Sequence, residues 1–451
     1  GGVAAHPRRR ARGAPDPPPM PGPLGRGVLA AALALVPLTL CGCGGGGGGA
    51  HRPASKKSTV IIMRHCLRAT PEDGITAKEG FSYYSNYSKD PWPLFDVPGY
   101  HCLPRGEEIV TAQGRWWKSR GGFQTPLRVI ADNLLDPVNN GQRDKVTMYR
   151  FLEGLGLSRP WAAHDATVQL DHGMFIPPDT DACQSAKPSD EALRASAEEH
   201  QRANPPPEPA YSEAMRRLSE VVGEGAAGKW TDIDCGVTML PPTGLPKPAG
   251  SCDAAAAFAE RLLMEWGSGD MKVGWGRVGL GEIPGLFLLQ MWYFFNWWAV
   301  KEVYRYWGAP IIRATLESLD KEGTTIFVGH DSDMMMLKGA LGLEWDTAPY
   351  PLNVTLPGSM LRFIRDGDQV SASYAYVGDF NSTAGEMRVV EARFPPSSRS
   401  SDELADQMPF SEFADLLREN SIEECAGRSD HAPAPDAKPP GSAEAAEVLA
   451  I

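Results

Sequence analysis

The chain has 451 residues, of which 42% are hydrophobic and 22% are charged, an ordinary balance for a soluble globular protein. It is long enough to form more than one hydrophobic core. A formal net charge of −12 at pH 7 argues against nucleic acid as a partner, because proteins that bind nucleic acid usually present a basic face. Arginines that cluster in such an acidic chain indicate a local site for a small anion.

The first 50 residues are predicted to lie outside the folded part. Residues 1–19 are rich in Arg, Pro and Ala, and Arg26 then precedes an apolar run from Val28 to Leu40 that small residues follow. This order is typical of a secretory signal peptide, and the run is shorter than the roughly 20 residues of a membrane span. A lipid anchor on Cys43 is the alternative. We therefore expect a secreted or cell-surface protein, in the secretory pathway or periplasm, with no membrane span in the mature chain.

Six cysteines follow this leader, an even number that indicates disulfides in an oxidising compartment. They are Cys66, Cys102, Cys183, Cys235, Cys252 and Cys425. Cys235 and Cys252 flank a Pro/Gly-rich loop and are the expected local pair, and the absence of a CxxC spacing argues against a zinc site. Sequons at Asn86, Asn353 and Asn381 are compatible with a eukaryotic secretory route and predict a glycoprotein.

The first predicted strand leads directly into a histidine between two arginines. Thr59 to Met63 is apolar and largely β-branched, as in a buried strand, and Arg64, His65 and Arg68 follow. Ligands of an open α/β sheet bind at the carboxyl ends of its strands. The position therefore favours a nucleophile or base that acts on an anion, although a strand end with solvated arginines has the same pattern.

The next predicted elements are a helix and a strand. The helix begins near Leu103, and its tryptophans are assigned to the core. Val146 to Tyr149 is predicted to be a second parallel strand, yet it runs without a break into residues 150–155, which have the pattern of a helix end. A βα unit needs a connection and several helical turns, so this unit looks shortened.

An inserted helical region is predicted over residues 161–308. It includes an acidic helix near Ser189–His200 and an amphipathic helix from Ala254 to Glu265. The aromatic stretch from Leu286 to Trp307 is long enough to cross a membrane. Its polar and charged residues instead favour a buried helix of a soluble domain.

A second strand of the same design ends in another histidine. Thr324 to Val328 is apolar and is followed by Gly329, His330 and Asp331, with a helix and then a β-hairpin after them. The order of elements predicts an α/β fold with a mostly parallel sheet between helices and an inserted α-helical cap. We expect the α/β core at about 56–160 and 309–428 within a domain of residues 51–428, the cap at about 161–308, and a disordered tail at 429–451.

The two strand ends together carry the groups that phosphoryl transfer needs. Arg64, Arg68 and His330 can clamp the phosphoryl oxygens, because guanidinium matches phosphate geometry. A neutral His65 can attack phosphorus and form a phosphohistidine. Asp331 can donate a proton to the leaving alkoxide and then accept one from water, so activity is expected to peak in acid. This scheme involves no metal and no cofactor, and its partner is a small phosphorylated substrate.

The rival interpretation is an HD-type metal site at His330 and Asp331. Such a site needs further His and Asp ligands, and the nine histidines of the chain form no second convincing cluster. A histidine that only caps a strand end is the structural alternative. Neither accounts for the arginines around His65.

These motifs resemble the histidine acid phosphatases, the branch of the phosphoglycerate-mutase-like superfamily that includes bacterial phytases and glucose-1-phosphatases. The resemblance rests on the segment from Arg64 to Arg68 and on Gly329-His330-Asp331, and it runs from about Val60 to Cys425. It implies that His65 is the nucleophile, that Arg64, Arg68 and His330 bind phosphate, and that Asp331 is the proton donor. It also implies disulfides Cys183–Cys425 and Cys235–Cys252.

Two departures from the family pattern qualify the expected activity. Cys66 stands where the family has glycine, and Cys102 is its expected partner, with a free thiol as the alternative. The family also has a segment Ala-Asp-x-x-x-Arg-Thr after the second strand, and its arginine is a third phosphate ligand. The sequence predicts that this segment is missing near Tyr149 and that Arg150 is the nearest substitute. The alternative function is therefore a weakened family member that binds phosphorylated ligands.

Overall fold

The computed structural model describes residues 57–70, 88–133, 142–223, 235–380, 387–395 and 405–427. The predicted leader, the sequon residues Asn86 and Asn381 and the tail at 429–451 lie outside these ranges. None of the described helices combines the length and apolarity needed to cross a membrane. Asn353, the remaining sequon residue, is buried, and its Oδ1 accepts a hydrogen bond from the Trp345 backbone N–H, so its side chain is not available for glycosylation in this conformation.

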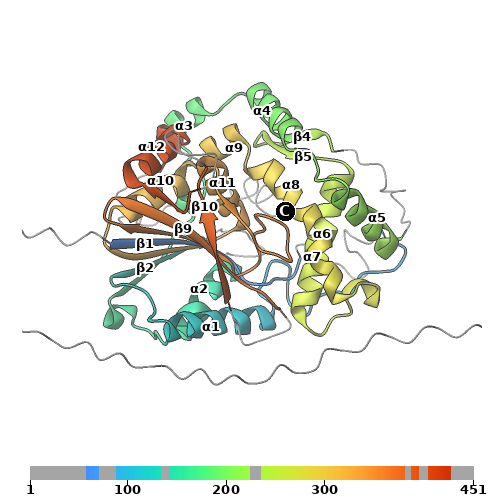
Figure 1. Cartoon of the computed structure of the whole chain (residues 1–451), viewed down its shortest axis with the longest axis horizontal. Helices are drawn as coiled ribbons and strands as arrows, with labels where there is room; N and C mark the ends of the chain where they lie inside the picture. Colours follow the sequence, from blue (N-terminus) through green and yellow to red (C-terminus); the bar gives the residue numbers. More distant parts are fainter. Residues whose placement is uncertain are drawn as a thin grey trace, which may run out of the picture. The chain divides into compact units, whose positions relative to one another are not determined.

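The described residues form a mixed sheet of nine strands, in the order β3-β2-β6-β1-β8-β9-β10-β7 with β11 against β9 (Figure 1). The strands are β1 (Lys57–Arg64), β2 (Leu127–Ala131), β3 (Ala166–Leu170), β6 (Gly323–Gly329), β7 (Glu344–Trp345), β8 (Met360–Asp366), β9 (Gln369–Val377), β10 (Met387–Arg393) and β11 (Gln407–Pro409). Strands β3, β2, β6 and β1 run parallel, and the other pairs are antiparallel. The parallel half contains both predicted histidine strands.

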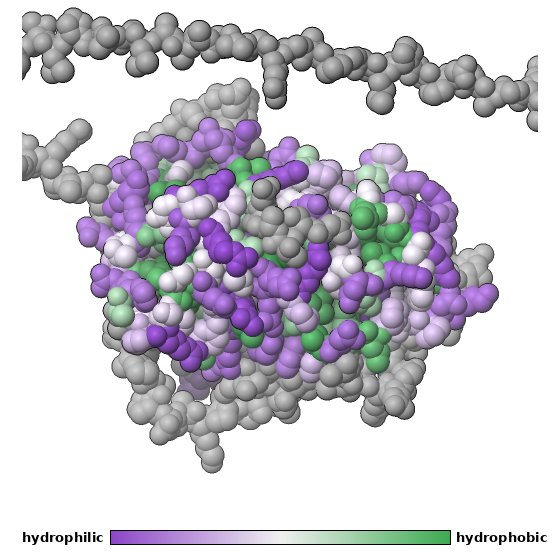
Figure 2. All heavy atoms as spheres, turned by 90° about the horizontal axis from the view of Figure 1, so that it is seen from below, coloured by the Kyte–Doolittle hydropathy of each residue, from purple (hydrophilic) through white to green (hydrophobic). Residues whose placement is uncertain are grey.

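Helices cover both faces of the sheet (Figure 1). They are α1 (Pro104–Ser119) and α2 (Gln142–Gly154) on one face, and α10 (Ala309–Leu319), α11 (Asp331–Leu341) and α12 (Phe410–Glu419) on the other. The face of the molecule that α1 and α2 form is mostly hydrophilic, with its hydrophobic residues in small separate areas (Figure 2). The apolar sides of these helices therefore face the sheet.

A helical region is inserted between β3 and β6, at the right and top of Figure 1. It contains α3 (Asp181–Ala186), α4 (Asp190–Ala203), α5 (Ala210–Val222), the hairpin of β4 (Val237–Leu240) and β5 (Leu245–Pro248), α6 (Ser251–Ser268), α7 (Ile283–Leu286), α8 (Leu288–Trp298) and α9 (Lys301–Tyr306). Short 3-10 turns lie at η2 (Trp161–His164), η3 (His172–Met174), η4 (Val273–Gly276), η5 (Leu280–Glu282) and η6 (Glu423–Cys425). The predicted α/β class with a helical domain is confirmed.

The predicted strand at Val146 to Tyr149 is wrong, because these residues lie inside helix α2. Buried side chains recur in this helix as adjacent pairs one turn apart, at residues 143–144, 147–148 and 151–152. A four-residue apolar run does not distinguish a strand from one face of a buried helix. The second parallel strand is β2, and residues 132–141 connect it to α2. The βα unit is therefore not shortened.

Two further boundaries differ from the prediction. Strand β3 pairs with β2 in the sheet, so the residues immediately after position 161 belong to the α/β core rather than to the cap. The aromatic stretch is two helices, α8 and α9, because Val300 has extended backbone angles at the junction. A change of backbone conformation at one residue leaves no mark in a continuous apolar pattern.

Three disulfides connect the six described cysteines. Cys183–Cys425 joins α3 to the last described turn, and Cys235–Cys252 lies in the helical region. Cys66–Cys102 connects the residue after His65 to the start of α1. The expected pairing of Cys66 with Cys102 is thus present, and Cys66 is not a free thiol in this structure.

Candidate active site

Strand pairing brings the two predicted histidine motifs together. In the parallel register of β1 and β6, Arg64 lies opposite Gly329, and the backbone N–H of His65 donates to the Gly329 carbonyl at 2.9 Å. The His65 and His330 ring centroids are 5.6 Å apart at an interplanar angle of 70°. Both side chains are buried, so the carboxyl ends of two adjacent strands form one site.

The two flanking arginines are buried and share a carboxylate that sequence reasoning missed. Glu260, on α6, accepts from Arg64 Nη2 at 2.9 Å and from Arg68 Nη2 at 3.3 Å. Arg64 Nη2 also lies 2.9 Å from Asp331 Oδ2. Burial by itself would raise the pKa of Glu260, but the charges of Arg68, Arg64 and Arg143 outweigh it and lower the pKa. A single carboxylate in an amphipathic helix carries no local signal that distinguishes it from a surface residue.

Arg143, which sequence reasoning also missed, is a third buried guanidinium at the site. Its side chain is almost fully buried, with only 2% of the residue exposed, and its Nη2 lies 3.3 Å from His330 Nδ1. It stands near the start of α2, and Ala131-Asp132, the opening of the family segment, stands at the end of β2. The Ala-Asp pair directly after an apolar strand is the signal that could have located the segment.

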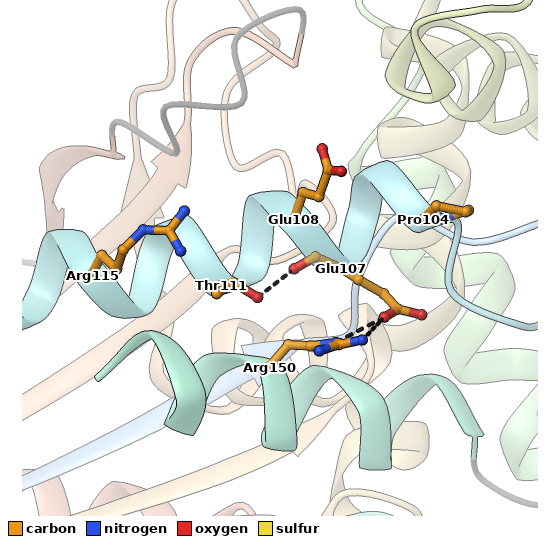
Figure 3. Close-up of a pocket in the computed structure, with 6 residues that line it drawn as sticks. All are labelled: Pro104, Glu107, Glu108, Thr111, Arg115 and Arg150. Atoms are coloured by element: carbon orange, nitrogen blue, oxygen red, sulfur yellow. Dashed lines mark hydrogen bonds and ion pairs between the residues drawn. The ribbon is translucent and has the colours of Figure 1, made fainter. Parts of the chain in front are cut away.

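Arg150 does not take the part of this third arginine. It projects from α2 toward α1, where it forms an ion pair with Glu107 at 2.8 Å (Figure 3). It also forms an ion pair with Glu153 of its own helix at 2.9 Å. Its side chain is 45% exposed, and its charge is already compensated. The prediction that Arg150 substitutes for a missing ligand is wrong, because Arg143 stands in the first turn of α2 beside His330, whereas Arg150 lies about two turns further along the helix and pairs with Glu107 of α1.

The imidazole of His65 is held in a form suited to nucleophilic attack. Its Nδ1 lies 2.9 Å from the Cys66 carbonyl oxygen, which can only accept, so Nδ1 carries the proton and Nε2 holds the lone pair. Burial, followed by the charges of Arg143, Arg68, Arg64 and His330, lowers the pKa of His65 well below its usual value. The ring therefore stays neutral in mildly acidic solution.

His330 has a different environment. Its Nε2 donates to Asp132 Oδ2 at 2.9 Å, and Asp132 Oδ1 accepts from His172 Nδ1 at 2.6 Å. Burial would lower the pKa of His330, but the Asp144 charge and then the contact with Asp132, against the opposing charge of Arg143, raise it. Burial likewise opposes ionisation of Asp132, yet the hydrogen bonds from His172 and His330 hold its pKa far below the usual range. Arg143 Nη2 can only donate, so His330 Nδ1 accepts from it in this arrangement, and the raised pKa of His330 favours a proton on Nδ1 when Arg143 turns toward a bound anion.

Comparisons with known proteins agree with this arrangement. No family model matches the chain. Phytase AppA of Escherichia coli (strain K12) is 24% identical over 345 residues, which cover 68% of this chain and 76% of that protein. The resemblance to the histidine acid phosphatases is confirmed.

Solved phytase structures share the fold. A Hafnia alvei phytase in complex with myo-inositol hexakis sulphate superposes with a TM-score of 0.65 at 20% identity, covering 82% of this chain and 98% of that one. A Citrobacter braakii phytase gives a TM-score of 0.65 at 21% identity, with 82% and 99% covered. At these identities the structures establish the fold of this histidine-acid-phosphatase-like chain, and its own residues must carry any argument about substrate.

A small cavity lies at the centre of this phosphatase-like site. Its volume is about 20 Å³. Its lining residues are His65, Arg68, Arg143, Phe294, Trp298, His330, Asp331 and Ser332. The polar residues come from the segments that follow β1 and β6, from the start of α11 and from α2. The two aromatic residues come from α8. All five residues predicted from the sequence to act at the site are thus at or next to one cavity, since Arg64 contacts Asp331.

One group of described residues has the ligand types and spacing to hold a cation. The donor atoms of Asp132, Asp144 and His330 all lie within 4.8 Å of one another. Both oxygens of Asp132 already accept histidine N–H groups, and the Arg143 guanidinium lies beside His330 and Asp144. Burial, against the charges of His330 and Arg143, raises the pKa of Asp144 to about 6, so its carboxyl is partly protonated in mild acid. The group fits an anion-binding site better than a metal centre.

Proposed function

We propose that this protein is an acid phosphatase that hydrolyses phosphate monoesters through a phosphohistidine intermediate. The observation that carries the proposal is one cavity in which a neutral His65 lies beside Arg68, Arg143 and His330, with Arg64 next to it in contact with Asp331. Three guanidiniums and the His330 ring converge on one imidazole, and this arrangement suits a phosphoryl group, whose non-bridging oxygens such donors can bind. Carboxylates lie beside each of these basic groups: Glu260 and Asp331 pair with Arg64, Asp144 pairs with Arg143, and Asp132 pairs with His330. Arg68, Arg143 and His330 still line the cavity beside His65.

The first half of the reaction transfers the phosphoryl group. The arginines bind the non-bridging oxygens of the monoester, and His65 Nε2 attacks phosphorus opposite the ester oxygen. The P–N bond forms as the P–O ester bond breaks, and the Asp331 carboxyl donates its proton to the departing alkoxide. Arg64 Nη2, which contacts Asp331 in this structure, is free to turn to phosphate when Asp331 is protonated.

The second half regenerates the enzyme. The Asp331 carboxylate takes a proton from a water molecule, which attacks phosphorus on the face that the alcohol has left. The P–N bond breaks, inorganic phosphate forms, and His65 recovers its neutral imidazole. Each proton given up by Asp331 in the first half is thus returned in the second, so the cycle is balanced.

The weakened, binding-only alternative loses its motivation. It depended on a missing third arginine near Arg150, and Arg143 lies at the cavity with a buried side chain. The secretory localisation expected from residues 1–50 is consistent with three disulfides, which form in oxidising compartments. Both points support an active secreted or cell-surface enzyme.

The deciding experiment measures phosphate release from a generic aryl phosphate at pH 4–6. Wild type and His164→Ala should be active, because His164 is exposed and outside the cavity, whereas His65→Ala should be inactive although it remains folded. Quenching a reaction with labelled phosphate ester should trap label on wild type and not on His65→Ala. No phosphate release from folded wild type would refute the proposal, and loss of activity in EDTA would point to the Asp132 cluster as a metal site.

A further inference from the structure

We propose that the site selects monoesters of an apolar, preferably aromatic, alcohol that carries no second phosphate. This inference rests on the proposed function and concerns the alcohol half of the substrate. The phosphate half is accounted for by the arginines and His330. The other wall of the cavity consists of Phe294 and Trp298, both on α8.

The aromatic wall is held in place by its neighbours. Phe294 is 7% exposed and Trp298 is 3% exposed. The Trp298 ring stacks on Trp297 with centroids 4.8 Å apart, and Phe294 packs edge-on against Trp297 at 6.0 Å. Trp297 is itself fully buried. The wall is therefore an extension of the core and not a set of mobile surface side chains.

The small volume of the cavity excludes a hydrated alcohol. A space of about 20 Å³ holds roughly one or two water molecules, since a single water occupies at least about 10–15 Å³ by this measure. The phosphoryl group of a bound ester occupies this space, so the alcohol that it carries lies against the lining rings with little room for water between them. Hydroxyl or phosphate groups on the alcohol would lose their water against apolar carbon, whereas an aromatic or aliphatic group would replace ring–water contacts with ring–ring contacts.

The basic residues that line the cavity are grouped around one position, where a single phosphate can bind. The cationic lining residues Arg68, Arg143 and His330 surround His65, and the remaining lining positions from the described residues are aromatic, acidic or a serine. Glu260 further neutralises Arg64 and Arg68 from the α6 side. Among the described residues that line the cavity, a second phosphate on the alcohol would thus meet Phe294 and Trp298 rather than a further cation. The Hafnia alvei neighbour, crystallised with a hexasulphate, shares the fold, but this wall is unsuited to such a polyanion.

The test compares two alkyl phosphates whose alcohols are similar leaving groups, benzyl phosphate and glycerol 2-phosphate, together with inositol hexakisphosphate. Wild type should show the highest kcat/KM for benzyl phosphate and the lowest for the hexakisphosphate. Phe294→Ala and Phe294→Leu should each lower the benzyl-to-glycerol ratio by about 3- to 10-fold, the size expected for loss of an aromatic contact. The ratio cancels any common effect of opening the cavity.

Phe295→Ala is the matched control, because Phe295 is on the same helix but packs against His200 and Lys338, outside the cavity lining. It should leave the ratio unchanged. Calorimetric Kd values for benzylphosphonate and methylphosphonate give the same comparison without turnover. Tighter binding of benzylphosphonate that Phe294→Leu removes would support the proposal even if catalysis failed. Equal affinities, or a wild-type preference for glycerol 2-phosphate or the hexakisphosphate, would overturn it and leave the phosphatase proposal standing.

Discussion

Arg143 and Arg150 lie on the same helix and have opposite surroundings. Arg143 is buried beside His330, and Arg150 is an exposed member of an ion-pair group with Glu107 and Glu153. The first position can contact a bound phosphate, and the second cannot reach the cavity that the structure describes. Arg143 is therefore placed to bind an anion, whereas Arg150 belongs to the helix surface.

Replacing Arg143 should therefore cost activity, and replacing Arg150 should not. Arg143→Gln removes one charge-assisted contact worth about 1.5–3 kcal/mol, which lowers kcat/KM by about 10- to 150-fold. Steady-state kinetics with an aryl phosphate measure the effect, and Arg150→Gln serves as the matched control. Equal losses in the two variants would show that the effect comes from helix α2 and not from the cavity.

Arg143→Gln should also change the pH dependence of kcat/KM. The lowered pKa of His65 keeps the nucleophile neutral below its ordinary value near 6.5, so the acid limb of kcat/KM should lie below pH 6.5. Arg143 is the largest charge that lowers this pKa. In Arg143→Gln the pKa of His65 should rise, because one positive charge is removed. The ring then protonates at higher pH, and the acid limb of kcat/KM moves to higher pH. An unchanged limb in an active variant would count against His65 as the group that titrates.

Helices α1 and α2 approach each other closely at two glycines. A Cβ added to Gly154 would overlap the Thr111 carbonyl oxygen, and one added to Gly114 would overlap the Phe151 carbonyl oxygen. The contact fixes α2 against the sheet, where it holds Arg143 at the cavity and lets the Thr147 hydroxyl accept from the Cys66 N–H at 2.8 Å. The close contact of the two helices therefore helps to position Arg143.

Gly154→Ala should accordingly weaken both the fold and the activity. The helices must separate to admit the methyl group, at a cost of about 1–3 kcal/mol in the free energy of unfolding, and Arg143 moves with α2. Denaturant titration measures the first effect, and kcat/KM measures the second. Gly285→Ala is the control, because a Cβ there meets no atom within 4 Å. Wild-type values for Gly154→Ala would mean that the helix contact is looser than described.

Across the whole molecule, the disulfides close loops of very different length. Cys183–Cys425 joins residues 242 positions apart, and Cys235–Cys252 joins residues 17 apart. The longer bridge connects the helical region with the last described turn, and so with the end of the α/β core. Because a longer loop loses more entropy on closure, the bridge should contribute more to stability.

Paired serine substitutions test this difference. Removing Cys183–Cys425 should lower the free energy of unfolding by about 5 kcal/mol, and removing Cys235–Cys252 by about 3 kcal/mol. Chemical denaturation of both double variants under oxidising conditions gives the comparison. A larger loss for the Cys235–Cys252 pair would mean that local packing in the helical region, and not loop length, sets the contribution.

Short sequence patterns were enough to locate several parts of this protein. An apolar β-branched run ending in a histidine is local information, and it located β1, β6, His65, His330 and Asp331. The helices with clear periodicity, α4 and α6 among them, were likewise located. These predictions succeed because strand burial and helix amphipathicity depend on neighbours only a few residues apart.

The residues that distant segments bring to the site could be identified only from the folded chain. A helix and a strand both accommodate residues 146–149, and packing of α2 on α1 and the sheet selects the helix. That choice replaced Arg150 with Arg143 at the cavity. Phe294 lines this cavity and Glu260 pairs with Arg64 and Arg68, and both come from the inserted region, about 200 residues after His65 along the chain. Their identity as site residues depends on long-range packing, which no periodicity or spacing within the sequence records.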